Sequence, residues 1–252
     1  MSGQETEAAI ETGLDLLSTV QNAAASLMTR DEIEKHTVAF MRTAGGTRPD
    51  LRVVEFEGQK VVVKDFRRSD ILFRLLIGPI MIRRERGALL KLRGVSGVPQ
   101  FIQRLDRYAI IIEHIEGSAL KNYTGPIPED FFDKLADVMR ACHEHGVVHC
   151  DLRSSGNVMI TPDGEPKVVD FAACAFKGRG WNPFINFIFR NFVDADLYAV
   201  LMLKRKHTPE KLRPEELERL STPLPYEKFA KSFGCGVRNI TRKLLTRNKN
   251  PG

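Results

Sequence analysis

The chain has 252 residues, 42% of them hydrophobic and 28% charged, and this balance excludes a chain that is disordered throughout. The formal net charge of +6 favours an anionic partner, such as a nucleotide, a phosphorylated lipid, an acidic membrane surface or nucleic acid. No stretch of the sequence reaches the roughly 18 apolar residues of a transmembrane helix, and the acidic N-terminus is unlike a signal peptide.

The four cysteines are not spaced as a metal-binding or redox pair. Cys142, Cys150, Cys174 and Cys235 form no CxxC motif. We therefore expect reduced thiols in a cytoplasmic protein and no zinc site.

The N-terminal part of the chain is predicted to be helical. Ile10, Leu14 and Leu17 share one face of an amphipathic pattern over residues 7–28. Thr29 and Glu32 then have the spacing of a capping box, which starts a second, short helix that is expected to reach the Gly45-Gly46 breaker. Residues 1–44 are thus predicted to form a helical extension that packs on the body of the protein or on a partner.

The rest of the chain predicts strands first and helices later. We expect a hairpin with a Glu-Gly turn at residues 51–66 and a helix at 79–93. A β-prone run follows at residues 108–117 and an amphipathic helix at 129–146. Two short strands are expected at residues 157–160 and 166–171. A further helix is expected to start near Asp196, and the last fifty residues look helical and basic. This order predicts an α+β fold of two lobes, with a small antiparallel-sheet N-lobe over residues 45–115 and a mostly helical C-lobe over residues 116–252.

Five polar residues lie on or next to these elements, in an order that indicates a catalytic site. Lys64 ends the strand VVVK, Glu85 lies on the next helix, Asp151 and Asn157 lie in the loop HCDLRSSGN, and Asp170 ends the strand KVVD before Phe-Ala. A loop between two buried strands rarely carries an acid and an amide unless they have a function.

These motifs resemble those of the protein-kinase-like superfamily, in particular small bacterial kinases related to lipopolysaccharide core (Kdo/heptose) kinases and RIO-type kinases. The resemblance covers roughly residues 50–205 and implies a two-lobed kinase-like fold that uses ATP and Mg²⁺. It implies that Lys64 binds the nucleotide phosphates and is held by an ion pair with Glu85. Asp151 would accept or orient the proton of the attacking hydroxyl, and Asn157 and Asp170 would bind magnesium.

The same resemblance assigns three further positions. The run IIIEHIEG would join the two lobes, so that backbone groups from Glu113 to Ile115 meet the adenine ring. His149 would brace the catalytic loop by hydrogen bonding. Asp196 would hold the same loop from below, unless Asp194 or Asp196 is only a helix N-cap.

The sequence also departs from the kinase pattern. Asp151 and Asn157 are 157 − 151 = 6 positions apart, one more than in typical protein kinases, and Cys150 replaces the usual Arg, which makes a phosphate-switched activation loop improbable. Ala172 replaces the usual Gly, no APE motif follows, and the glycine-rich loop is reduced to Gly45-Gly46. The reduced loop is the main argument for a non-catalytic member of the superfamily.

Two segments bear on the phosphate acceptor. Residues 71–84 and 176–192 mix bulky apolar side chains with arginine, which suits the headgroup boundary of an anionic membrane or, equally, packing inside the lobes. Three hypotheses follow: a kinase for a lipopolysaccharide-core-like sugar or glycolipid at the cytoplasmic membrane face, a RIO-like serine/threonine protein kinase, and a non-catalytic binding module. No nucleic-acid partner is expected, because the C-terminal basic residues are more typical of a solvated or membrane-directed face.

Overall fold

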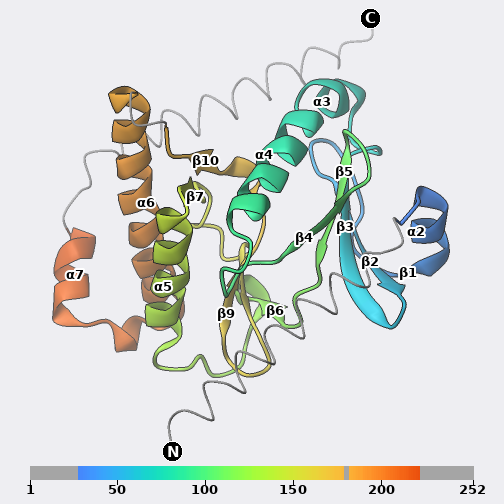
Figure 1. The fold of residues 1–252 in the computed structure, drawn as a ribbon. Coiled ribbons are helices and arrows are strands. Elements are labelled where there is room, and N and C mark those ends of the chain that lie inside the picture. Colours follow the sequence, from blue (N-terminus) through green and yellow to red (C-terminus); the bar gives the residue numbers. More distant parts are fainter. Residues whose placement is uncertain (1–27, 179–181, 222–252) are drawn as a thin grey trace, which may run out of the picture.

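The computed structural model describes residues 28–178 and 182–221 as two lobes (Figure 1). The N-lobe holds a five-stranded antiparallel sheet in the order β1-β2-β3-β5-β4. Its strands are β1 Thr37–Arg42, β2 Asp50–Phe56, β3 Gln59–Asp65, β4 Phe101–Arg104 and β5 Ala109–Glu113. The predicted hairpin is therefore confirmed as β2 and β3, and its turn residue Glu57 has a positive φ of 51°.

The two faces of this sheet are covered by different helices, as Figure 1 shows. Helix α2 (Arg30–His36) contributes Ile33 to a cluster with Val61 and Val63, whereas Val62 belongs to the main core shared with α4 (Gly78–Lys91). Successive side chains of a strand alternate between faces, so the valines of VVVK bury both faces and Lys64 falls on the face of Val62.

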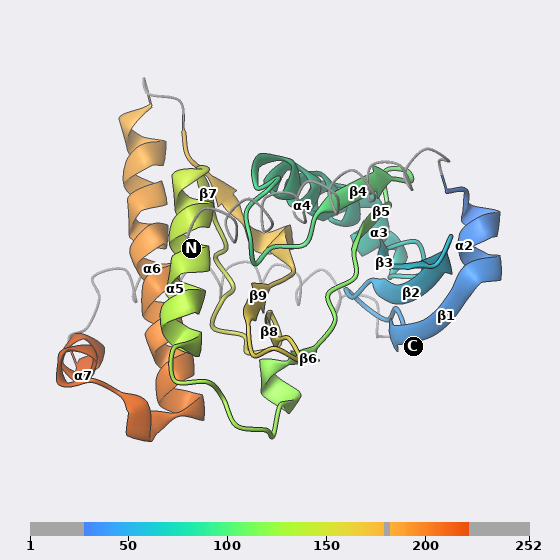
Figure 2. The same cartoon turned by 60° about the horizontal axis from the view of Figure 1, so that its bottom comes forward.

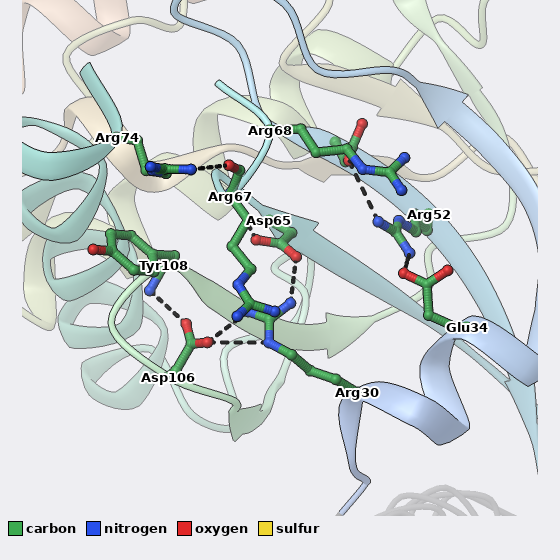
Figure 3. Close-up of polar contacts among 10 residues, drawn as sticks. Arg30, Glu34, Arg52, Asp65, Arg67, Arg68, Arg74, Asp106 and Tyr108 are labelled. Atoms are coloured by element: carbon green, nitrogen blue, oxygen red, sulfur yellow. Dashed lines mark hydrogen bonds and ion pairs between the residues drawn. The ribbon is translucent and has the colours of Figure 1, made fainter. Parts of the chain in front are cut away.

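Ion pairs fasten α2 to the sheet, as Figure 3 shows. The Arg30 guanidinium lies 2.6 Å from both Asp65 Oδ2 and Asp106 Oδ2, and Arg52 on β2 reaches Glu34 on α2 at 2.8 Å. The predicted Thr29–Glu32 capping box is present at the start of this helix. This part of the N-terminal extension therefore packs on the body of the protein.

The C-lobe is mostly helical, and α5 and α6 lie side by side in both views (Figures 1 and 2). Its helices are α5 Phe131–Glu144, α6 Pro183–His207 and α7 Pro214–Ser221, with short 3₁₀ turns η1 Leu120–Asn122, η2 Phe171–Ala173 and η3 Pro209–Lys211. Short strands form two small sheets: β6 Ser118–Ala119, β7 Val147–Val148, β8 Val158–Ile160, β9 Pro166–Val168 and β10 Ala175–Phe176.

Two predicted boundaries are wrong. The second N-terminal helix ends at His36, and residues 37–42 form β1 because they pair with β2, a contact that a local pattern cannot reveal. Helix α6 starts at Pro183 and not near Asp196, because the Asn182 side chain accepts a hydrogen bond from the N–H of Ile185 and caps the helix. The predicted helix over residues 7–28 lies almost wholly outside the described residues, as does the chain after residue 221.

Helix α3 (Ile71–Leu76) precedes α4 and lies at the top of Figure 1. None of the helices over residues 28–178 and 182–221 has both the length and the apolar character to span a bilayer.

Candidate active site

The predicted lysine, helix glutamate and strand-end aspartate meet at one point. Lys64 Nζ lies 2.6 Å from Glu85 Oε2 and 2.7 Å from Asp170 Oδ1. Lys64 reaches this point from β3, Glu85 from α4, and Asp170 from the residue just before η2. The ammonium group thus joins the N-lobe sheet, its covering helix and the C-lobe.

The charges in this cluster shift one another's titration. The positive charge of Lys64 holds the pKa of Asp170 down at about 2, so this carboxyl is ionised at neutral pH. Burial by itself disfavours the Lys64 ammonium, but Asp170 and Glu85 outweigh it and raise the pKa of Lys64. Burial raises the pKa of Glu85, which Lys64 opposes. Because one cation faces two carboxylates, this cluster can still attract a further cation.

Helix α4 is also tied to the segment that follows Asp170. The Arg84 guanidinium donates to the carbonyl oxygens of Ala173 and Cys174, and the Cys174 thiol lies 3.7 Å from the Arg84 carbonyl oxygen. These contacts hold Glu85 toward Lys64. The sequence offered a signal for them only in the crowding of arginines around Glu85.

The loop that carries Asp151 is held in a strained conformation by Asp196. The Asp196 carboxylate, 2% exposed, accepts the backbone N–H of His149 at 2.7 Å and of Cys150 at 3.1 Å. Cys150 has a φ of 66°, a left-handed conformation that costs free energy unless surrounding contacts impose it. The expected brace is therefore present, and Asp196 lies inside α6 and is not its N-cap.

His149 connects the loop to the strand before Asp170. Its Nε2 lies 3.0 Å from the Val169 carbonyl oxygen, and its ring packs edge-on against Phe171 at 4.9 Å between centroids. His143 of α5 was missed from the sequence: its Nε2 lies 3.1 Å from Asp196 Oδ2.

Asp151 and Asn157 are in direct contact. The Asn157 amide nitrogen donates to the backbone carbonyl oxygen of Asp151 at 2.9 Å and to its carboxylate at 3.1 Å. The extra residue between them is taken up by a turn in which the N–H of Asn157 donates to the Ser154 carbonyl oxygen, while Lys206 of α6 holds the Ser155 hydroxyl.

The donor set at Asn157 and Asp170 fits Mg²⁺. Because the amide nitrogen of Asn157 is engaged by Asp151, its carbonyl oxygen is the atom left to serve as a ligand. Asp170 adds an ionised carboxylate whose side chain is 40% exposed. Magnesium prefers such oxygen ligands and retains several waters, so two protein ligands suffice.

A cavity between the lobes brings the remaining predicted residues together. Glu113 and Ile115 line it along with Lys64, Glu85 and Asp170. Its apolar walls were not singled out from the sequence: Met41, Leu51, Val62, Pro99, Ile112, Met159 and Val169. Leu51 and Val62 follow from the alternation of β2 and β3, whereas Met159 and Val169 depend on how the lobes meet.

The thiols near this site are free. Cys142 and Cys174 are buried, and burial raises the pKa of each to about 12. Cys150 is also free, and burial raises its pKa. These cysteines are protonated at neutral pH and are poor nucleophiles, while Cys235 lies outside the described residues.

Comparison with known proteins relates this chain to kinases. The RIO domain family model matches residues 52–176. Mouse sperm motility kinase 2B is 30% identical over 121 residues, which cover 45% of this chain and 24% of the mouse protein. A Lactococcus lactis protein named "Probable serine/threonine-protein kinase PknB" is 27% identical over 123 residues, or 46% of this chain and 17% of that protein. The chain thus spans a quarter or less of these curated relatives.

Solved structures share the fold. The Rio2 kinase–ADP/Mg²⁺–phosphoaspartate complex from Chaetomium thermophilum superposes with a TM-score of 0.52 at 18% identity, over 78% of this chain and 60% of that one. A second Rio2 structure from the same organism gives a TM-score of 0.53, also at 18% identity, over 78% of this chain and 63% of the other. The chain thus has the two-lobed protein-kinase-like fold of these structures, and its residues 52–176 match the RIO domain family.

Proposed function

We propose that the protein is an ATP-dependent phosphotransferase of RIO type, which moves the γ-phosphate of ATP to a hydroxyl group and requires Mg²⁺. The observation that carries this proposal is the meeting of Lys64, Glu85 and Asp170 within 2.7 Å of the lysine nitrogen, in the cavity that Glu113 and Ile115 also line. A binding module that had lost catalysis would have no need to keep this set together with Asp151 and Asn157.

The residues divide the chemistry of phosphoryl transfer among themselves. Lys64, held by Glu85, offers its ammonium to the phosphates, and backbone groups between Glu113 and Ile115 meet the adenine. Bound magnesium would offset the charge that develops on the phosphoryl oxygens. Asp151 orients the acceptor hydroxyl and takes its proton, and Asn157 fixes the Asp151 carboxylate through the 3.1 Å hydrogen bond.

Transfer by an Asp151→Asn variant tests this assignment. Asp151 is exposed, so the variant should fold like the wild type and lose phosphate transfer while still binding ATP. Transfer is measured with labelled ATP, and folding by thermal unfolding. Wild-type transfer rates in Asp151→Asn would show that another group takes the proton, and a wild type that binds no nucleotide would leave only the non-catalytic hypothesis.

For the acceptor, the first candidate is a serine or threonine hydroxyl of a protein. Its support is the RIO domain match and the kinase relatives named above. The second candidate is a sugar or glycolipid hydroxyl at the inner face of the cytoplasmic membrane, where this chain would bind as a peripheral protein.

A specific feature favours the second candidate: both arginine-containing apolar segments are exposed. On α3, Ile71 is 63% and Leu76 58% exposed. On the first turns of α6, Phe184 is 70% and Phe187 62% exposed, whereas Phe189 is buried. Figure 1 shows α3 and the start of α6 toward the top of the view, one on each lobe. Residues 71–84 and 182–193 contain no acidic residue, which suits an anionic lipid surface.

Sedimentation with vesicles distinguishes a membrane role from a soluble one. Vesicles rich in phosphatidylglycerol should bring down the wild type, and Phe184→Ser with Phe187→Ser should reduce the bound fraction. Leu217→Ser, which changes a half-exposed leucine on the distant α7, is the matched control. Full binding by the double variant would remove α6 from the proposal. Turnover with a lipopolysaccharide core fragment, a generic protein substrate or no acceptor then separates the two acceptor classes.

A further inference from the structure

The first strand of the sheet ends on Arg42, directly after Met41, which lines the nucleotide cavity. Arg42 on β1 is paired with Leu51 on β2, and Leu51 is paired with Lys64 on β3. Directly paired residues of neighbouring strands project to the same face of a sheet. Through an irregular register between Phe40 and Arg42, this pairing places Arg42 beside Leu51 and Lys64, both of which line the cavity.

The Arg42 guanidinium is partly buried and paired with no carboxylate. Its Nε donates to the Pro49 carbonyl oxygen at 3.2 Å, and among the described residues its two terminal nitrogens have no hydrogen-bond partner and no ion pair within 4.0 Å. Burial lowers the pKa of Arg42, and the nearby charges of Asp170 and Glu85 partly offset this cost. Such a guanidinium presents two parallel N–H donors to whichever anion enters.

The turn after Arg42 explains why a side chain is needed here. Glycine-rich loops of kinases cover phosphates, and backbone N–H groups are the usual donors in such loops. In this chain the N–H groups of Gly45 and Arg48 donate to each other's carbonyl oxygens, at 3.4 and 3.1 Å, and the N–H of Ala44 donates to the Asp50 carboxylate. Three N–H groups of the turn are thus already engaged within the turn and its flanking residue.

The turn is also fixed from outside. The N–H of Asp70 donates to the Gly46 carbonyl oxygen at 2.9 Å, and the Ser69 hydroxyl donates to the Arg48 carbonyl oxygen at 2.8 Å. These bonds hold the turn against the segment that leads into α3. They limit how far the turn can move toward a nucleotide. The Arg42 side chain at the end of β1 is then the group that can contact the phosphates.

We propose that Arg42 binds the β- and γ-phosphates of the nucleoside triphosphate from the side of the sheet, together with Lys64. This inference rests on the proposed ATP-dependent activity. A polyphosphate between the two cations would give Arg42 the anionic partner that it lacks, with charge-assisted hydrogen bonds that are stronger than neutral ones. The reduced Gly45-Gly46 loop is then compatible with nucleotide binding.

Nucleotide affinity of Arg42 variants tests the inference. Arg42→Gln keeps a donor for the Pro49 carbonyl oxygen and removes the charge. Arg42→Lys keeps the charge and removes the two parallel N–H donors of the guanidinium. Arg107→Ala, which removes an exposed arginine in the β4–β5 turn, is the control for net charge. Calorimetry with Mg²⁺ measures ATP and adenosine binding to each full-length protein, and thermal unfolding shows that each is folded.

The Arg42→Gln variant should bind ATP roughly tenfold or more weakly than the wild type and bind adenosine equally well, because a hydrogen bond to a charged group contributes on that scale. Arg42→Lys should fall between, and Arg107→Ala should match the wild type. Equal ATP affinity in Arg42→Gln overturns the role of Arg42 and leaves the proposed function standing. Equal losses for ATP and adenosine overturn it too, since Arg42 would then only shape the pocket. No ATP binding by the wild type overturns the proposed function itself.

Discussion

Lys64 Nζ lies 2.7 Å from Asp170 Oδ1, although the two residues are 106 positions apart in the chain. In our proposal one of them binds phosphate and the other binds magnesium. In this structure each serves as the other's counter-ion, and Glu85 completes the cluster at 2.6 Å. Arrival of magnesium and nucleotide would replace the Lys64–Asp170 contact by one between Lys64 and phosphate, while Glu85 keeps the lysine in place.

Removal of the Lys64 charge should destabilise the protein as well as stop transfer. Lys64→Met leaves the buried carboxylate of Glu85 without its cation, and breaking a buried pair in this way costs about 3–5 kcal/mol. Adding Glu85→Gln removes the unpaired charge, so the double variant should regain part of the free energy of unfolding without regaining activity. Urea unfolding measures the stability of the single and the double variant. A double variant no more stable than Lys64→Met would contradict the importance of this pair for stability.

The low pKa of Asp170 predicts where its contribution to stability is lost. A carboxyl whose pKa is lower in the folded than in the unfolded protein stabilises the fold above its unfolded pKa, about 3.9, and loses that effect as the pH falls through the folded value. With a folded pKa of about 2, the stability difference between wild type and Asp170→Asn should be constant above pH 5 and should change between pH 4 and pH 2.

Carbon NMR of the Asp170 carboxyl checks the cause of this shift. Because the charge of Lys64 is its largest contribution, the pKa of Asp170 should rise in Lys64→Met. An unchanged pKa would mean that Lys64 does not set it. Since the carboxyl is ionised throughout the range from pH 5 to pH 8, its titration should not alter Mg²⁺ affinity there.

Asp170→Ala should abolish the magnesium dependence of nucleotide binding. The variant retains Asn157 but loses the ionised carboxylate of the ligand pair, and an amide oxygen alone holds Mg²⁺ poorly. Calorimetry with ATP should give the same affinity with Mg²⁺ and with EDTA in this variant, whereas the wild type should bind more tightly with Mg²⁺. A variant that retains the difference would place the metal on other ligands.

The positions of Lys64 and Asp170 could be predicted because each stands at the end of a strand whose own pattern is clear. VVVK alternates across a sheet, so Lys64 falls on the face of Val62, and Asp170 directly follows a buried strand. The role of β1 could not be predicted, since TVAFMR becomes a strand only by pairing with β2. In addition, the irregular register between Phe40 and Arg42 decides to which face of the sheet Arg42 projects. Arg42 was missed for that reason.

The start of α6 was missed for a different reason. Asn182-Pro183 is a good helix start, but the apolar and arginine residues of 176–192 suit a membrane boundary or a lobe interior equally, and neither interpretation fixes where a helix begins. As a result Asp196 looked like a residue near the start of a helix. In the structure α6 has 25 residues, and Asp196 lies within it, opposite the backbone of the catalytic loop.

Replacement of Asp196 should loosen the catalytic loop. Asp196→Ala leaves the N–H groups of His149 and Cys150 buried without an acceptor and removes the partner of His143, at a cost of about 2–4 kcal/mol. The left-handed conformation of Cys150 then lacks its main restraint, so transfer should fall further than nucleotide affinity. Asp194→Ala is the matched control, because Asp194 is an exposed aspartate two residues earlier on α6. Similar stabilities for the two variants in urea would show that the loop does not depend on Asp196.

Arg84 should control how often α4 holds Glu85 against Lys64. Its guanidinium binds the carbonyl oxygens of Ala173 and Cys174, so Arg84→Ala should release the helix from the segment after Asp170. We expect a several-fold lower kcat with little change in unfolding free energy, because Arg84 is exposed and makes these contacts with neutral carbonyl groups. Arg83→Ala removes another exposed arginine from the same turn and should leave kcat unchanged. If both variants lose the same activity, the cause is the net charge of α4, and the contact with Ala173 and Cys174 has no separate effect on catalysis.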